Sequence, residues 1–286
     1  MIPRTLQQVI PATATADGAG VKLRRSIGQS PAARLDPFLM LDEFGTDNPD
    51  DYIAGFPDHP HRGFETVTYM LDGHMLHQDH MGNRGDLNSG DVQWMTAARG
   101  IIHSEMPQQT AGRMRGFQLW INLPAAEKMK PAAYRDIPAA QIPAVALPGG
   151  GRVKVIAGTL EADGKTTAGP MQGLSTAPLF FDVELVPRQV FRQALPAGHN
   201  AFLYAYEGDV GVGEPPRALP SRSAGILSDG DRVTVTAGDH GSRFILLAGR
   251  PLREPVVQYG PFVMNTREEI EQAVHDYQTG RLTQPA

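Results

Sequence analysis

The 286-residue sequence contains no cysteine. Disulfide bridges, thiolate metal ligands and a cysteine nucleophile are therefore excluded. Any metal ion that this chain binds must be held by nitrogen and oxygen ligands.

The sequence also lacks a surplus of positive charge and any long apolar run. Its 26 Lys and Arg residues are outnumbered by 31 Asp and Glu residues, which gives a formal net charge of -5. We therefore expect no direct contact with nucleic acid, which requires a basic surface. Because no apolar run could cross a membrane and the N-terminus has no signal-peptide pattern, we expect a cytoplasmic protein without membrane contact.

Helix-forming patterns are scarce as well. The chain has 31 glycines and 24 prolines, and only residues 266–280 carry a long helix-like pattern, with Asn265 or Thr266 as the cap. Short apolar runs between glycine and proline turns fill most of the remainder, which favours an all-β protein. The length is sufficient for two domains.

Histidine is unevenly distributed. Six of the nine histidines lie between His59 and His103, where His59 and His61 form one pair and His103 and Glu105 form another. On a β-strand, residues two apart point to the same face, about 7 Å from each other. Each pair can therefore present two side chains to one ion.

The interval between these pairs contains several hairpin signals, at Asp72-Gly73, residues 81–83 and Gly90-Asp91. A lone His-x-His pair often lies on an exposed strand and binds no metal. Here the turns can bring the two pairs onto neighbouring strands of a barrel, so we predict one metal site with ligands His59, His61, His103 and Glu105. A closed structural zinc site is disfavoured because such sites prefer cysteine.

The second half of the chain has the same style of short strands but no comparable pair. Its histidines, His199, His240 and His275, are expected to be ordinary loop or surface residues. An Ala- and Pro-rich stretch, residues 125–151, indicates a linker between the halves.

Four segments together resemble the pirin family of the cupin superfamily: residues 59–70, 90–107, 116–124 and 260–274. The resemblance implies a bicupin, with two antiparallel, jelly-roll-like β-barrel domains and a C-terminal helix. The expected boundaries are 1–130 for a metal-binding cupin, 131–265 for a cupin without metal ligands, and 266–286 for the helix and tail. Residues that match the family's ligands are the same four, His59, His61, His103 and Glu105.

Two positions depart from the general cupin pattern. Glu65 stands where many cupins place a metal ligand, and Pro107 stands where many have asparagine. Both changes are typical of pirins, and Glu65 stays a candidate for contacting the ligands.

The resemblance implies two kinds of function. The first is a metal-dependent dioxygenase, which opens the ring of a flavonol such as quercetin with O2 and releases carbon monoxide. Its metal would be Fe(II), with Mn, Co, Ni, Cu or Zn as alternatives, and Glu105 would both ligate it and accept the flavonol proton. The second is a metal- or redox-sensing regulatory protein that binds a transcription factor or metabolic enzyme. We expect a monomer in either case.

Several residues near the ligands are candidates for a substrate pocket, which is usually apolar with few polar groups. We expect Phe56, Met106 and Gln118 to line it. Among His74, His77 and His80, only His77 could enter the pocket, and a surface position is favoured for it. Arg62 is expected to point away from His61 as a surface or loop residue.

Overall fold

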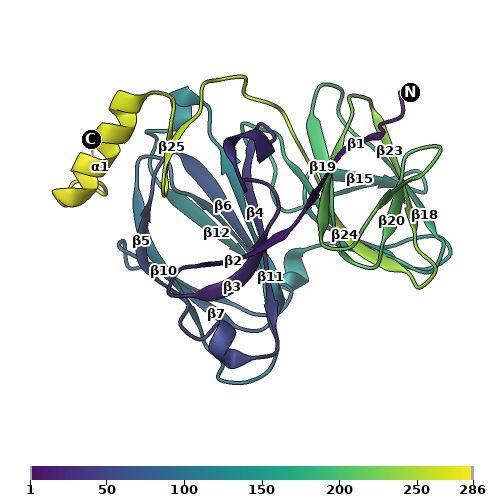
Figure 1. Ribbon diagram of the computed structural model, residues 1–286, viewed down its shortest axis with the longest axis horizontal. Coiled ribbons are helices and arrows are strands. Elements are labelled where there is room, and N and C mark those ends of the chain that lie inside the picture. Colours follow the sequence, from purple (N-terminus) through teal and green to yellow (C-terminus); the bar gives the residue numbers. More distant parts are fainter. Residues whose placement is uncertain (1, 285–286) are drawn as a thin grey trace. The chain divides into compact units, whose positions relative to one another are not determined.

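The computed structural model describes residues 2–284, which fall into two compact units (Figure 1). The histidine unit comprises Thr13–Gln29, Phe38–Ala139 and the residues from Leu252 onwards. The apolar unit comprises the residues up to Ala12, Ser30–Pro37 and Ala140–Pro251. Each unit is thus assembled from separate segments of the chain, and the linear boundaries at residues 130 and 265 stay a prediction.

Two antiparallel sheets form the barrel of the histidine unit. The larger sheet has the order β12-β9-β6-β11-β4-β3-β2 and the smaller has the order β5-β10-β7-β8. The strands are β2 (Thr13–Asp17), β3 (Val21–Arg25), β4 (Phe38–Thr46), β5 (Phe56–His61), β6 (Phe64–Asp72), β7 (Met75–Asp79), β8 (Arg84–Leu87), β9 (Val92–Thr96), β10 (Ile101–Pro107), β11 (Met114–Asn122) and β12 (Ala133–Ile137).

The central strands of the larger sheet are β6 and β11, both rich in β-branched and aromatic residues. β11 pairs with β4 on one side and with β6 on the other. Because strand side chains alternate between faces, Gln118 and Trp120 share the face of β11 that lines the barrel interior. Phe117, Leu119 and Ile121 occupy the other face and are fully buried.

The apolar unit repeats this design with a larger sheet, β1-β22-β19-β24-β17-β14-β13, and a smaller one, β18-β23-β20-β21. A separate hairpin joins β15 to β16. The strands are β1 (Leu6–Pro11), β13 (Ala144–Ala146), β14 (Arg152–Ala157), β15 (Thr159–Ala162), β16 (Lys165–Ala168), β17 (Leu179–Leu185), β18 (Val190–Ala194), β19 (Asn200–Glu207), β20 (Val210–Val212), β21 (Arg217–Leu219), β22 (Ser223–Leu227), β23 (Arg232–Ala237) and β24 (Ser242–Gly249).

The C-terminal segment returns to the histidine unit. It forms a hairpin of β25 (Val257–Tyr259) and β26 (Phe262–Met264), which packs beside the helix α1 (Arg267–Gln278), yellow in Figure 1. Thr266 caps α1: its side chain accepts a hydrogen bond from the Glu269 backbone N–H, and the Glu269 side chain accepts from the backbone N–H of Thr266. The predicted all-β bicupin architecture with a C-terminal helix is confirmed. Short 3-10 turns complete the described elements: η1 (Pro31–Ala33), η2 (Pro49–Asp51), η3 (Ala125–Glu127) and η4 (Ala139–Gln141).

Within residues 2–284, no helix is both long and apolar enough to cross a membrane.

Candidate metal centre

Three histidines from two neighbouring strands converge inside the barrel of the histidine unit. β5 and β10 are antiparallel, and His103 lies directly opposite His59. His61 shares the face of His59 because it is two residues further along β5. The ring centroids are 4.3 Å apart for His59 and His103, 4.7 Å for His59 and His61, and 4.9 Å for His61 and His103. Ligand atoms of all three lie within 4.8 Å of one another, so one ion can contact all of them.

The hydrogen bonds of these rings leave nitrogen atoms available for an ion. The Nδ1 of His59 lies 2.8 Å from the Pro57 carbonyl oxygen and can donate to it, which leaves the lone pair on Nε2. The Nε2 of His103 and the Nδ1 of His61 are buried without a hydrogen-bond partner in the described structure. Buried orphaned ring nitrogens beside one another are what a metal would satisfy, so this donor set fits a transition-metal ion.

Electrostatics support the same conclusion. Burial lowers the pKa of His61 well below its usual range, and the neighbouring His59 lowers it further. Burial likewise lowers the pKa of His103, with additional repulsion from His61 and His59. Both rings are therefore neutral near pH 7, which is the form that binds metals.

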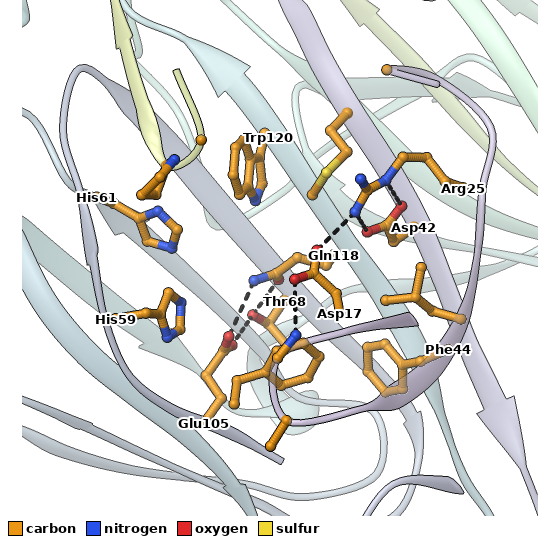
Figure 2. A pocket seen from close by; sticks show the side chains of 18 of the residues that line it. Asp17, Arg25, Asp42, Phe44, His59, His61, Thr68, Glu105, Gln118 and Trp120 are labelled. Atoms are coloured by element: carbon orange, nitrogen blue, oxygen red, sulfur yellow. Dashed lines mark hydrogen bonds and ion pairs between the residues drawn. The ribbon is translucent and has the colours of Figure 1, made fainter. Parts of the chain in front are cut away.

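Glu105 faces the same cavity, and its carboxylate points toward Thr68 and Gln118 (Figure 2) and is not part of the three-histidine group. Its Oε1 accepts a hydrogen bond from the Thr68 hydroxyl at 2.8 Å, and its Oε2 accepts from Gln118 Nε2 at 3.2 Å. The carboxylate thus lies beside the histidines on hydrogen-bonding partners of the facing sheet. Its predicted role as a fourth ligand stays a prediction.

His59, His61 and Glu105 border a cavity of about 690 Å³, within the range of small-molecule sites. Phe56 and Gln118 line it, as predicted from the sequence. Met106 is absent from the lining residues, because alternation along β10 puts His103 and Glu105 on the inner face and Met106 on the other. Trp120 also lines the cavity, with its ring 5.2 Å from that of His61 and its indole N–H unpaired among the described residues.

Glu65 is not brought to the histidines. It follows Phe64 on β6 and faces away from the cavity, where Trp94 Nε1 donates to it at 3.1 Å and the Thr96 hydroxyl at 2.8 Å. Burial raises the pKa of the Glu65 carboxyl. The structure therefore gives Glu65 a place in the outer packing of the larger sheet.

Two residues that sequence reasoning left on the surface are buried near the site. His77 is 1% exposed, and its Nδ1 lies 3.3 Å from His103 Nδ1. It stands opposite Glu105 in the pairing of β7 with β10. The apolar residues Met75 and Leu76, both buried on β7 directly before His77, were the signal that could have separated it from His74 and His80, which lie outside the strand.

Arg62 is the other, at 4% exposed, so its surface assignment was wrong. Its guanidinium donates to the Arg99 carbonyl, to Asp276 Oδ2 at 2.8 Å and to the Leu282 carbonyl at 3.2 Å. These bonds fasten the end of the histidine strand β5 to the C-terminal segment. In the apolar unit, His199 is also buried rather than exposed.

Comparison of the chain with known proteins finds similarity to one family. The family described as Pirin matches residues 20–121, and the Pirin C-terminal cupin domain matches residues 180–283. A Pseudomonas aeruginosa protein with the provisional name quercetin 2,3-dioxygenase is 54% identical over 267 residues, 93% of each chain. Pirin of Homo sapiens is 44% identical over 269 residues, covering 93% of this chain and 89% of its own. The crystal structure of quercetin 2,3-dioxygenase from Acinetobacter baumannii has a TM-score of 0.89 at 34% identity, with 98% of both chains covered.

Proposed function

Because the chain belongs to the pirin family of bicupin proteins, we propose that it is a metal-dependent dioxygenase acting on a flavonol such as quercetin. The reaction would open the flavonol ring with O2 and release carbon monoxide. One observation carries this proposal: three histidines converge, two of them buried with orphaned nitrogens, and His59 and His61 line a cavity that also holds the Glu105 carboxylate.

His59, His61 and His103 would hold the ion, with Glu105 as the proposed fourth ligand. Nitrogen and oxygen donors accept iron, manganese, cobalt, nickel, copper or zinc. We propose Fe(II), because O2 chemistry requires an ion with accessible redox states and zinc has none. When bound, the metal lowers the pKa of a coordinated hydroxyl group and provides an electron path to O2.

Glu105 is the proposed acceptor for the proton of the flavonol 3-hydroxyl. The Thr68 and Gln118 side chains hold its two oxygens, so the carboxylate is oriented before substrate arrives. It is 4% exposed, so protein groups rather than bulk solvent surround this proton acceptor. A deprotonated flavonol is the stronger reductant, which is why this transfer precedes attack by O2.

The test is carbon monoxide release from quercetin and O2 by protein reconstituted anaerobically with Fe(II). We expect release by the parent protein and none above background from His61→Ala treated identically. Glu105→Gln, which keeps the shape of the side chain but removes its basicity, should lower the rate about 100-fold or more.

A protein confirmed to hold its metal that released no carbon monoxide from quercetin would contradict the proposal. That outcome would favour the second function considered for this family resemblance, a metal-sensing regulator that binds a transcription factor or a metabolic enzyme.

A further inference from the structure

A row of polar side chains crosses the larger sheet of the histidine unit at one register. Arg25 on β3 pairs with Asp42 on β4, Asp42 pairs with Gln118 on β11, and Gln118 pairs with Thr68 on β6. All four line the cavity. In Figure 2, Thr68 and Gln118 lie nearer to Glu105, and Asp42 and Arg25 lie farther from it. Three strand spacings separate Arg25 from Thr68, about 14 Å. The proposed reaction uses only the end of this row beside Glu105.

The other end of the row is a preorganised cluster of three charges. Arg25 donates from Nε to Asp42 Oδ1 at 2.8 Å, and from NH2 to Asp42 Oδ2 at 2.7 Å and Asp17 Oδ2 at 2.9 Å. Asp42 is buried, whereas the Arg25 side chain is a quarter exposed. The NH1 group of Arg25 makes no hydrogen bond within residues 2–284, so a donor remains for a ligand.

Asp17 is fixed in place by the turn that follows it. The Gly18 N–H donates to Asp17 Oδ1 at 2.8 Å, and the Ala19 N–H donates to the Gly55 carbonyl at 3.0 Å. Gly18 has φ +58, and a Cβ there would lie 2.5 Å from a ring carbon of Phe56. Only glycine allows this turn to pack on the Phe56 side of the cavity, which places the Asp17 carboxylate at its rim.

The charges of this cluster decide what it can bind. One guanidinium between two carboxylates leaves a net negative charge, so an anionic group such as a carboxylate or phosphate is repelled. The cluster offers a donor, Arg25 NH1, and acceptor lone pairs on Asp17 and Asp42. A neutral group that both donates and accepts hydrogen bonds, such as a phenolic hydroxyl, satisfies both.

We propose that Arg25, Asp42 and Asp17 form a second subsite that binds the neutral phenolic hydroxyl groups on the substrate ring farthest from the histidines. The subsite selects uncharged, hydroxylated, multi-ring aromatic compounds against those with an acidic group at that end. Phe44 and Phe56 also line the cavity and provide aromatic surface for such a ring. This inference rests on the proposed function for the orientation of the substrate.

The test is an anaerobic binding titration of Fe(II)-loaded protein with three flavonols that share the 3-hydroxyl and 4-carbonyl edge. Quercetin carries hydroxyl groups on the remote ring, the second compound has none there, and the third carries a carboxylate. We expect quercetin to bind at least tenfold more tightly than the second compound, because hydrogen bonds to charged groups are lost. The third should bind most weakly.

Three variants locate the preference. Arg25→Gln combined with Asp42→Asn replaces the ion pair by neutral amides and should reduce the preference for quercetin to less than threefold, with metal content unchanged. Asp17→Asn, at an exposed position that tolerates change, should bring the carboxylate compound within threefold of the unhydroxylated one. The matched control is Arg115→Gln with Glu43→Gln, an ion pair between β11 and β4 on the opposite face, which should leave all three affinities unchanged.

Equal binding of quercetin and the unhydroxylated flavonol by the parent would overturn the subsite, as would a preference that survived both the double variant and Asp17→Asn. Failure of every compound to bind would overturn it too. Carbon monoxide release without a binding preference for quercetin would support the proposed dioxygenase activity and reject the subsite. Selective binding without carbon monoxide release would retain the subsite and reject the reaction.

Discussion

The two small sheets of this protein share one topology and carry opposite side chains. The histidine unit has the order β5-β10-β7-β8, and the apolar unit has β18-β23-β20-β21. In the first, His103 stands opposite His59, and Glu105 stands opposite His77. In the second, the matching ladders pair Val235 with Phe191 and Ala237 with Val210.

The interiors differ accordingly. In the apolar unit a cluster of 23 buried residues, all hydrophobic, packs inside the barrel, and it includes Phe181, Phe191, Phe244 and Val235. In the histidine unit the corresponding space is a cavity bordered by histidines, a carboxylate and the Arg25 cluster. The same barrel topology can therefore enclose a packed core or a pocket. The backbone pairing of the strands is alike in both units, and the side chains that point inward determine whether the interior is packed or hollow.

The largest expected effect comes from opening the packed interior. Phe181→Ala should lower the free energy of unfolding by about 3–5 kcal/mol, because it leaves a cavity among fully buried neighbours. His59→Ala, which only enlarges an existing cavity, should change it by less than about 1 kcal/mol in the metal-free protein. Urea denaturation measures both. Equal losses would show that the two interiors contribute alike to stability.

The next largest effect is expected from removing a proposed metal ligand. His61→Ala should weaken metal binding more than about 100-fold. This is a larger loss of affinity than is usual when a residue that only hydrogen-bonds to a metal ligand is removed. Circular dichroism should show the β-structure intact, since the barrels supply most of the stability. Metal content after dialysis is the measurement, and His240→Ala, an exposed histidine of the apolar unit, is the control. Unchanged metal content in His61→Ala would reject the site.

A smaller effect is expected from the contact behind His103. His77→Phe keeps a ring beside Tyr134, whose centroid lies 5.7 Å away, but removes the hydrogen bond to His103. Metal affinity should fall about 10–100-fold. His74→Phe, at a partly exposed position on the same hairpin, should leave the affinity unchanged. An unchanged metal affinity in His77→Phe would mean that packing alone orients the His103 ring.

The smallest effect is a pH dependence of the metal-free protein. The folded-state pKa values of His61 and His103 lie below the unfolded value of 6.5, because burial disfavours the charged form. The unfolded chain therefore binds more protons below about pH 6.5, and stability falls there by roughly 1 kcal/mol per pH unit for each histidine. Denaturation at several pH values should show a shallower slope for His103→Gln. An identical slope would assign the dependence to other groups.

Much of the site was predictable from residues close together in sequence. His59 and His61 share a face because alternation along a strand is local, and the same holds for His103 and Glu105. The hairpin signals between the pairs predicted that the two strands would meet, and β5 does pair with β10. The start of α1 was likewise predicted at Asn265 or Thr266, and the capping box between Thr266 and Glu269 decides for Thr266.

Other features depend on which strand faces which. The Glu105 carboxylate is held by Thr68 and Gln118 on the facing sheet, and no local pattern specifies those partners. Glu65 faces outward because the inner face of β6 is the one that includes Thr68. Arg62 is buried because residues from Asp276 to Leu282 return to it across more than 200 positions.

The sequence by itself determined that any metal bound here would have only nitrogen and oxygen ligands, that the chain is all-β with a C-terminal helix, and that four residues form the candidate ligand set. Tertiary structure alone decided that the Arg25, Asp42, Gln118 and Thr68 side chains form one row, and that one barrel holds a cavity while the other is filled. The reason is that alternation acts between neighbours in the chain, whereas strand order and register are set by pairing between distant segments.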